Sequence, residues 1–164
     1  MDKSIRAAGL LVLIVCLIGC GASEPTRKAP DIVFESVSLP VKTTKLSDYK
    51  GRIVLVDFWA TWCGPCVQSM PLIQRMHDKY KDNGLVVLGV TDEGRFTVSE
   101  FLQKLKVKYT ILLDTNRTSL TDYELETIPA LFLIDKEGAV VYSHRGAPQD
   151  TVELESEIEK LLPR

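Results

Sequence analysis

Two short apolar runs with a helical pattern between them constrain the fold of this chain more than any other feature of its sequence. Residues Ile53–Phe58 and Leu85–Val90 are mostly apolar and rich in β-branched side chains, which is typical of strands buried on both faces. Between them, from Pro65 to Lys81, apolar residues recur every three or four positions, which predicts an amphipathic helix. Because such a strand–helix–strand unit crosses over in one hand, we expect the two strands to be parallel.

The remaining pattern extends this unit into one α/β domain of ordinary size. A second helix is expected from Thr97 to about Lys106, because Thr97-Val98-Ser99-Glu100 matches a capping box. A final helix is expected after Asp150, capped by Asp150 with Glu153. The shorter expected elements are an N-terminal hairpin and turn within 31–50, a brief strand at 111–113, a helical turn at 119–125, and a hairpin of strands 130–134 and 139–143.

The first twenty residues have the features of an export signal. Lys3 and Arg6 precede 16 uncharged residues, fewer than the roughly 20 that a membrane-spanning helix needs. The segment Leu17-Ile18-Gly19-Cys20 resembles the lipobox of bacterial lipoproteins, which implies cleavage before Cys20 and lipid attachment to its sulfur. An uncleaved anchor, or a signal cut at another site, would also place the domain outside the cytoplasm.

The predicted export signal and lipidation site divide the chain into three parts. Residues 1–19 are expected to be a lipoprotein signal peptide, residues 20–30 a lipidated cysteine with a flexible tether, and residues 31–164 the folded domain. The protein is then expected to be bacterial, exported and lipid-anchored to a membrane, with its domain facing the periplasm or extracytoplasmic space.

Charge and cysteine content narrow the possible functions. With 20 basic residues against 22 acidic ones, the chain lacks the positive field that binding a nucleic-acid backbone requires, so we expect no nucleic-acid partner. Four cysteines are too few for a disulfide-stapled mini-protein. The expected signal peptide removes Cys16 and the lipid occupies Cys20, which leaves the pair Cys63 and Cys66 for chemistry.

The position of this pair controls its reactivity. Cys63 is expected at the start of the first helix, where free backbone N–H groups and the helix dipole favour a thiolate. Lowering a cysteine pKa from about 8.5 to about 7 raises the ionised fraction at neutral pH from about 3% to about half. We therefore expect Cys63 to be the nucleophile and the less exposed Cys66 to resolve the mixed disulfide.

The residues around the pair resemble a known family. The segment from Val56 to Cys66, reading VDFWATWCGPC, resembles the active-site segment of thioredoxin. Pro71 matches the proline that kinks the thioredoxin helix, and Ile128-Pro129 matches the cis-proline loop. The inserted helix from Thr97 and the lipid tether are similar to exported TlpA/ResA-type thiol-disulfide oxidoreductases. This resemblance implies a thioredoxin-like α/β fold, with a central mixed sheet, helices on both faces, an N-terminal β-hairpin and an inserted helix.

The resemblance also implies roles for individual residues. It makes Asp57 a buried carboxylate that accepts a proton from Cys66, with burial raising its pKa; the alternative is a strand-end carboxylate held by a hydrogen-bond partner. It makes Pro129 cis, so that the backbone of Ile128 pairs with a substrate segment; the alternative is a trans turn proline. It places Trp62 over the disulfide at the binding rim, unless that ring only packs.

Two residues depart from the pattern of the exported relatives. Many of these relatives carry a glutamate three residues after the second cysteine, where this chain has Ser69. Asp57, conversely, is thioredoxin-like, whereas several exported relatives differ there. The acid-base group of those relatives is therefore missing or replaced here.

The direction of electron flow follows from the same resemblance. Gly64 and Pro65 form the thioredoxin pair between the cysteines, and Ile128 before the cis-proline is also thioredoxin-like, so we expect a reductant of protein disulfides. The implied partners are an oxidised protein, such as apocytochrome c, and a membrane thiol-transfer protein that donates electrons. We expect a monomer that needs no cofactor beyond its redox-active cysteine pair.

Other functions remain open for a paired cysteine motif. A structural zinc site needs four ligands, and His77 and His144 are the only histidines available, so we expect no metal site. A thioredoxin-fold copper metallochaperone is one alternative, although such proteins resemble C-x-x-x-C rather than C-x-x-C. A thiol peroxidase is another, although Ala60 stands where peroxiredoxins have threonine.

Overall fold

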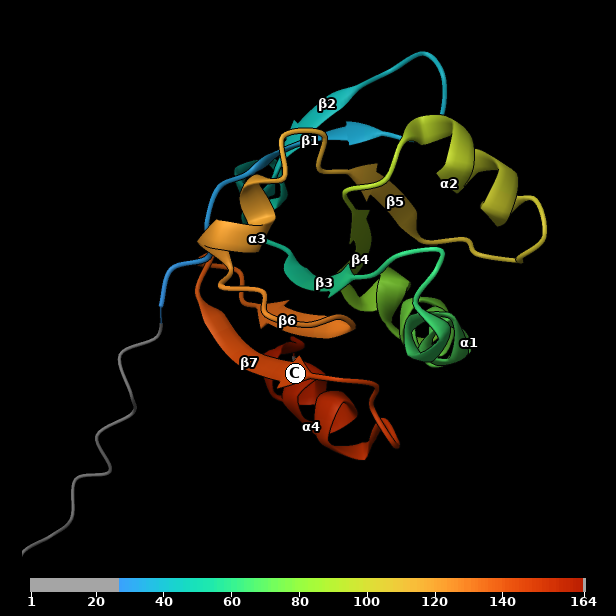
Figure 1. Cartoon of the computed structure of the whole chain (residues 1–164). Helices are drawn as coiled ribbons and strands as arrows, with labels where there is room; N and C mark the ends of the chain where they lie inside the picture. The colour runs from blue at the N-terminus through green and yellow to red at the C-terminus, as the bar shows by residue number, and fades with distance from the viewer. Residues whose placement is uncertain (1–26, 164) are drawn as a thin grey trace, which may run out of the picture.

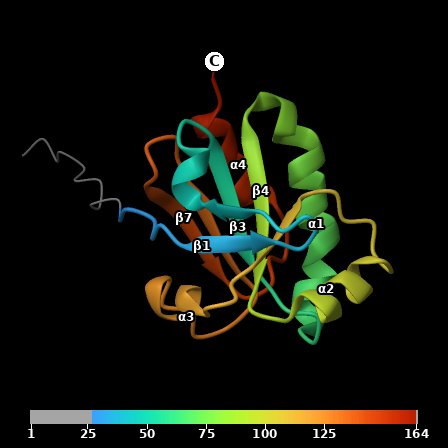
Figure 2. The same ribbon diagram turned by 90° about the horizontal axis from the view of Figure 1, so that it is seen from above.

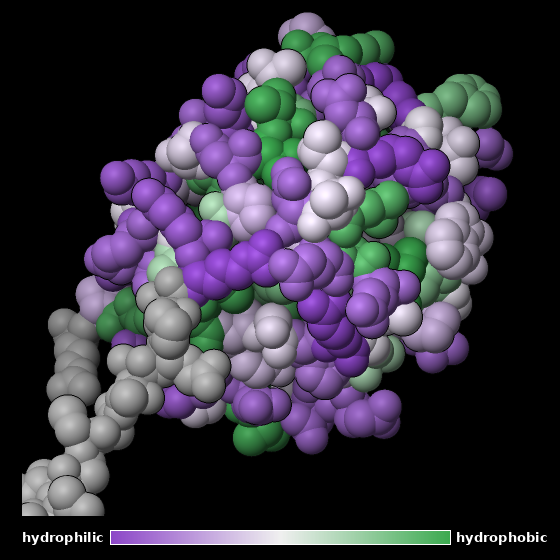
Figure 3. All heavy atoms as spheres, turned by 60° about the vertical axis from the view of Figure 1, so that its left-hand side comes forward, coloured by the Kyte–Doolittle hydropathy of each residue, from purple (hydrophilic) through white to green (hydrophobic). Residues whose placement is uncertain are grey.

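The computed structural model describes residues 27–163. The expected signal peptide, the expected lipidation site at Cys20 and most of the expected tether lie outside the described residues. Within this range no helix combines the length and the apolar character that crossing a bilayer requires. Figure 3 shows the face where the described chain begins, on which hydrophilic side chains surround small groups of apolar ones.

The described residues form one mixed sheet with helices packed on it (Figure 1). Its seven strands run in the order β2-β1-β5-β4-β3-β6-β7. The strands are β1 (Val33–Ser36), β2 (Thr43–Lys45), β3 (Ile53–Phe58), β4 (Leu85–Thr91), β5 (Thr110–Leu113), β6 (Ala130–Ile134) and β7 (Val140–Arg145). The α-helices are α1 (Gly64–Tyr80), α2 (Arg95–Leu102), α3 (Thr118–Asp122) and α4 (Val152–Leu161), and the short 3-10 helices are η1 (Leu46–Tyr49) and η2 (Lys81–Asn83).

The centre of the sheet is the expected parallel unit. Strands β3 and β4 are parallel, and β4 is parallel to β5. The outer pairs β1–β2, β1–β5, β3–β6 and β6–β7 are antiparallel. All six residues of β3 are buried, as expected for a central strand covered on both faces. The expected N-terminal hairpin is confirmed as β1 and β2.

Two hydrophobic cores cover the two faces of this sheet. Helices α1, α2 and α4 contribute to the core on one face, where Ile73, Val98 and Ile158 are fully buried. The other core includes Leu46 of η1 and Tyr123, which follows α3. Figure 2 shows α3 on the opposite side of the sheet from α1 and α4. The expected α/β architecture with helices on both faces is therefore confirmed.

The ends of two helices differ from the sequence prediction. Helix α2 begins at Arg95 with Gly94 as its N-cap, so the expected capping box at Thr97 is wrong. Its last turn tightens after Leu102, so it ends before the expected Lys106. Thr97 lies within the first turn of α2, and its side chain is exposed. The helix begins before Thr97 because contacts with distant segments, described below, fix the loop that precedes it.

The last helix also begins differently from the prediction. The N-cap of α4 is Thr151, and the Asp150 carboxylate accepts the N–H of Val152 at 3.0 Å. The expected reciprocal partner Glu153 instead accepts a hydrogen bond from the Tyr142 hydroxyl at 3.5 Å. The part of the predicted capping box that involves Glu153 is therefore wrong. The apolar face of α4 lies on the sheet as predicted, with Leu154 and Ile158 buried.

Candidate active site

The two cysteines lie where the first central strand leads into the first helix. Cys63 is the N-cap residue of α1, and a disulfide joins it to Cys66 in the first turn. The backbone N–H of Cys66 donates to the Cys63 sulfur over 3.2 Å. Cys63 is 5% exposed and Cys66 is 1% exposed, so the first sulfur is the more accessible of two buried ones. Gly64 and Pro65 between them are exposed.

Asp57 lies in β3 on the sheet face that α1 covers. Its side chain is 1% exposed, and neither carboxylate oxygen has a hydrogen-bond partner among the described residues. Burial raises the pKa of Asp57 from 3.8 to about 7, because a charged carboxylate without partners is poorly solvated there. The alternative of a strand-end carboxylate held by a hydrogen-bond partner does not match this environment.

Two further buried polar groups lie near Asp57, and the sequence analysis did not single them out. The Trp59 indole nitrogen and the Tyr109 hydroxyl are both buried without a partner in the described part of the chain. Burial, and then the Asp57 charge, raises the pKa of Tyr109 above its usual range. Tyr109 comes just before β5, about fifty residues along the chain from Asp57, so only the sheet topology could place them together.

The cis-proline loop lies at the same end of the sheet as the disulfide. The Ile128–Pro129 peptide bond is cis, and Pro129 immediately precedes β6. Residue Ala130 of β6 is opposite Phe58, the last residue of β3, so the loop lies beside the β3–α1 connection. The Pro129 carbonyl accepts the N–H of Gly146, which fixes the loop from β7.

A surface cavity of about 230 Å³ opens beside this loop. Trp62, Ile128 and Leu120 line it together with the buried Trp59, and an ion pair between Arg117 and Asp92 lies at its edge. The Trp62 side chain is 73% exposed, so this ring does not pack into the core. An exposed apolar ring beside a disulfide provides a surface on which another polypeptide can dock.

Glu93 is another residue that the sequence analysis did not identify. It follows the end of β4, and its two carboxylate oxygens accept hydrogen bonds from the backbone N–H and the hydroxyl of Thr61, each 2.6 Å long. Thr61 precedes the disulfide by two residues. The only available signal was the position of Glu93 after a buried parallel strand, since such strands end at one common edge.

Ser69, at the position where the resemblance implies a glutamate in many exported relatives, has a purely local contact. Its side chain is 3% exposed, and its hydroxyl donates to the Cys66 carbonyl oxygen over 2.8 Å. This hydrogen bond stays within helix α1 and satisfies a buried hydroxyl.

Neither histidine lies with the cysteine pair in a common ligand set. His77 of α1 lies near Tyr109 with tilted rings whose centroids are 6.4 Å apart, and burial lowers the pKa of His77. His144 lies in β7 opposite Leu131. Within residues 27–163 no three His, Cys, Asp or Glu side chains are grouped as a metal site would need.

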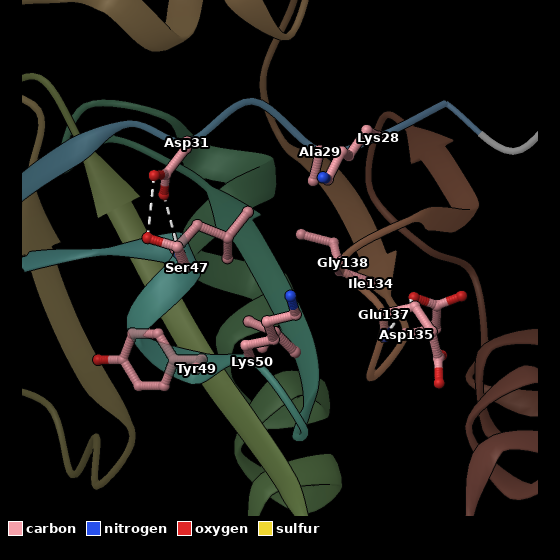
Figure 4. A pocket seen from close by; sticks show the side chains of 12 residues that line it. Lys28, Ala29, Asp31, Ser47, Tyr49, Lys50, Ile134, Asp135, Glu137 and Gly138 are labelled. Atoms are coloured by element: carbon pink, nitrogen blue, oxygen red, sulfur yellow. Dashed lines mark hydrogen bonds between the residues drawn. The ribbon is translucent and has the colours of Figure 1, made fainter.

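A second cavity, of about 200 Å³, lies at the opposite end of the sheet (Figure 4). It lies between η1, the start of the described chain and the turn between β6 and β7. The Asp31 carboxylate accepts the N–H of Ser47 at 2.8 Å and its hydroxyl at 2.9 Å on one side of this cavity. The cavity contains no cysteine and is separated from the disulfide by the length of β3.

Comparisons with known proteins agree with this geometry. A profile of the Redoxin family matches residues 24–162. The thiol-disulfide oxidoreductase ResA of Bacillus thuringiensis subsp. konkukian is 31% identical over 170 residues, covering 94% of this chain and 96% of ResA. A protein of Chlorobium tepidum assigned as the thiol:disulfide interchange protein DsbE superposes with a TM-score of 0.77 and 34% identity, covering 83% of this chain and 96% of that one. The exposed lipoprotein thioredoxin Etrx1 of Streptococcus pneumoniae superposes with a TM-score of 0.68 and 31% identity, covering 79% of this chain and 99% of that one.

Proposed function

Since the chain belongs to the Redoxin family and is a thiol-disulfide oxidoreductase with a thioredoxin-like fold, we propose that it reduces protein disulfides outside the cytoplasm. The observation that carries this proposal is the Cys63–Cys66 disulfide at the start of α1, with the cis-Pro129 loop beside it and Asp57 buried on the face that α1 covers. The sequence resemblance to TlpA/ResA-type proteins is confirmed by these relatives.

The reaction begins with the reduced protein. The Cys63 thiolate attacks one sulfur of the substrate disulfide, which forms a mixed disulfide and releases one substrate thiolate. Cys66 then loses its proton and attacks the Cys63 sulfur, which forms the Cys63–Cys66 disulfide and releases the second substrate thiolate. Two electrons pass from the cysteine pair to the substrate, and the two released thiolates take up protons. The sulfurs carry the electron pair themselves, so the exchange requires no cofactor.

Asp57 is proposed to accept the Cys66 proton. A pKa of about 7 leaves roughly half of the carboxyl groups ionised at neutral pH, so the group can both accept and release a proton there. Burial on the face that α1 covers supports this role, since Cys66 belongs to the same core. Among residues 27–163 the carboxylate has no fixed hydrogen-bond partner, so it is free to take the proton.

The substrate is proposed to bind across the rim formed by Trp62 and the cis-proline loop. The backbone of Ile128, beside Pro129, is positioned for strand-like pairing with an extended segment, and Trp62 covers one side of that segment. The exposed Gly64 and Pro65 leave the approach to Cys63 without a bulky side chain.

The direction of transfer is proposed from the residues around the sulfurs. Gly64 and Pro65 between the cysteines are those of thioredoxin, whose potential is near −270 mV, against about −120 mV for the oxidant DsbA. A reductant outside the cytoplasm needs a supply of electrons, for which we propose a membrane thiol-transfer protein. An oxidised apocytochrome c, with its C-x-x-C-H haem site, is the proposed substrate.

We also retain the proposal of a lipid anchor on Cys20 and a domain organisation of 1–19, 20–30 and 31–164. The lipobox-like residues before Cys20 support this, as does the similarity to a protein described as an exposed lipoprotein thioredoxin. The domain is proposed to act as a monomer at an extracytoplasmic membrane surface.

A redox titration tests the direction. The protein is equilibrated in glutathione and dithiothreitol buffers of known potential, and the fraction of free Cys63 and Cys66 is measured by alkylation. We expect a potential close to that of thioredoxin. A value above about −150 mV would overturn the reductant assignment while leaving thiol-disulfide exchange intact.

A further inference from the structure

The loop that carries Cys63 is held to the loop after β4 through the side chain of Glu93. After β3, the N–H of Trp59 still donates to the Val90 carbonyl at 3.0 Å, and the N–H of Cys63 closes a turn onto the Ala60 carbonyl at 3.1 Å. Between these two contacts, Thr61 is hydrogen-bonded to the loop that follows β4. Both its N–H and its hydroxyl donate to Glu93, each over 2.6 Å.

Glu93 is itself held in place. Its N–H donates to the Thr91 hydroxyl at 3.3 Å, which fixes it relative to the end of β4. The residue before it, Asp92, pairs with Arg117 at 2.6 Å. Shortly after it, Arg95 pairs with Glu35 at 2.8 Å and donates to the carbonyl oxygens of the last residue of β1 and of the residue that follows it. The Glu93 carboxylate is therefore a fixed point rather than a mobile surface group.

We propose that Glu93 is a positioning residue for the Cys63 nucleophile. In the oxidised protein the bond to Cys66 already holds Cys63 against the first turn of α1. Reduction breaks that bond, and the two hydrogen bonds from Thr61 then keep the loop, and the Cys63 thiolate, at the start of the helix. The thiolate depends on this place because the free N–H groups and the positive end of the helix dipole stabilise it there.

The same fold contains a matched control at its other end. Asp31 accepts the N–H and the hydroxyl of Ser47 at 2.8 and 2.9 Å, which is the same pattern of two bonds to one hydroxyl residue (Figure 4). Ser47 belongs to η1, before β3, whereas Thr61 follows β3. Removing the Asp31 contact therefore costs a comparable pair of bonds without touching the active-site loop.

The test compares Glu93→Gln with Glu93→Ala in a Cys66→Ala background. Both substitutions remove the charge, but glutamine retains one oxygen for the Thr61 N–H and one NH₂ group for its hydroxyl. The rate of Cys63 with a small aromatic disulfide is measured from pH 5 to 9, which gives both the thiol pKa and the rate at pH 7. Thermal unfolding of each variant reports stability separately.

We expect Glu93→Gln to react within about twofold of the Cys66→Ala parent. Glu93→Ala should have a Cys63 pKa about one unit higher than Glu93→Gln, and hence, for a parent pKa of about 7, a thiolate fraction and a rate about fivefold lower at pH 7. Thr61→Val, which loses only the hydroxyl bond, should fall between them. Asp31→Ala should lose stability but keep the parent pH profile.

Two results would overturn the inference. One is a Cys63 pH profile in Glu93→Ala identical to that in Glu93→Gln, and the other is an equal loss of rate in Asp31→Ala. The inference rests on the reactive Cys63 of the proposed function. The reactivity of the Cys66→Ala parent distinguishes a failure of that function from a failure of the inference about Glu93. If the parent itself reacts no faster than free cysteine at pH 7, the proposed function fails; if the parent is fast and the two Glu93 variants are equal, only the role of Glu93 fails.

Discussion

Asp57 and Gly89 lie directly opposite each other on the parallel strands β3 and β4. A Cβ atom on Gly89 would lie 2.7 Å from Ile111 Cδ1, 3.0 Å from the Tyr109 ring and 3.2 Å from the Trp59 indole nitrogen. The side chains beside the buried carboxyl group thus occupy the space that any larger residue at position 89 would need. The absence of a side chain at this position is what allows Tyr109 and Trp59 to approach β4 so closely.

Gly89→Ala should therefore destabilise the protein. The added methyl group forces Ile111 and the two buried aromatic rings to shift, and overpacking of this kind costs about 1–3 kcal/mol. Urea unfolding of the oxidised protein measures the change. Gly94→Ala is the matched control, because nothing lies within 4 Å of its Cβ position, and it should cause a smaller loss that is limited to the change of N-cap residue in α2. Equal losses in both variants would contradict this account of the β4 contacts.

The buried Asp57 should make stability fall as pH rises. Its folded-state pKa of about 7 is above its unfolded value of 3.8, so the folded state binds the extra proton between these values. The favourable contribution is complete below about pH 4 and is lost as the pH rises through 7. A shift of about three units corresponds to about 4 kcal/mol. Asp57→Asn cannot ionise, so its free energy of unfolding relative to the parent should rise by about that amount between pH 4 and pH 8.

Urea unfolding at pH 4, 6 and 8 checks this pH dependence. Asp122→Asn, at an exposed position, serves as the control and should show no comparable gain. A constant difference between Asp57→Asn and the parent across this range would mean that Asp57 does not titrate there in the folded protein.

The same substitution should separate the two steps of exchange. Asp57→Asn removes the proposed acceptor of the Cys66 proton, so release of the mixed disulfide should slow by about 10²-fold or more near neutral pH. The first attack by Cys63 should change much less. Stopped-flow measurement with a fluorescent disulfide peptide resolves the two phases. Slowing of both phases by the same factor would argue against a role for Asp57 in resolution.

Replacing one cysteine at a time should distinguish the two sulfurs. Cys66→Ala leaves Cys63 able to attack but removes the resolving thiol, so a mixed disulfide with a protein substrate should accumulate. Cys63→Ala should trap little, because Cys66 is 1% exposed. Non-reducing electrophoresis followed by mass spectrometry identifies the partners. Preferential trapping through Cys66 would reverse the assignment of nucleophile and resolving cysteine.

Ser69 should contribute to stability and not to redox chemistry. Ser69→Ala removes one buried hydrogen bond to the Cys66 carbonyl oxygen, while the hydroxyl itself disappears with it, so a loss of about 0.5–1.5 kcal/mol is expected. The reduction potential and the rate of mixed-disulfide release should stay at the parent values. A large fall in that rate with unchanged stability would show that the serine takes over the acid-base role of the family glutamate.

Local sequence patterns were sufficient to predict the central strands, the first helix and the position of the cysteine pair. The bounds of β3 match the prediction, because six consecutive buried residues leave little ambiguity, and the three- and four-residue spacing placed α1 within a residue or two. The start of α2 could not be predicted in this way. A capping-box match at Thr97 is a local signal, whereas the real start at Arg95 is fixed by bonds from Glu93 and Arg95 to distant segments.

The same distinction applies to the site. Cys63 and its place at the helix start follow from the order of a strand and a helix along the chain. The contact between Thr61 and Glu93 joins residues 32 positions apart, and Tyr109 reaches the neighbourhood of Asp57 only because β5 lies beside β4. No periodicity encodes such pairs, so only the folded structure identifies them.

The described chain begins beside the end of the sheet that lies away from the disulfide. Ala29 pairs with Gly138, in the turn after β6, whereas Pro129 precedes the other end of the same strand. Five residues of β6 separate these ends, roughly 17 Å of extended strand. With the proposed lipid on Cys20, an upright domain would point its sulfurs outward, toward substrates. For a donor embedded in the bilayer to reduce the cysteine pair, the domain must turn so that the pair faces the membrane. Shortening residues 20–30 should therefore slow re-reduction of the cysteine pair more than it slows reduction of the substrate.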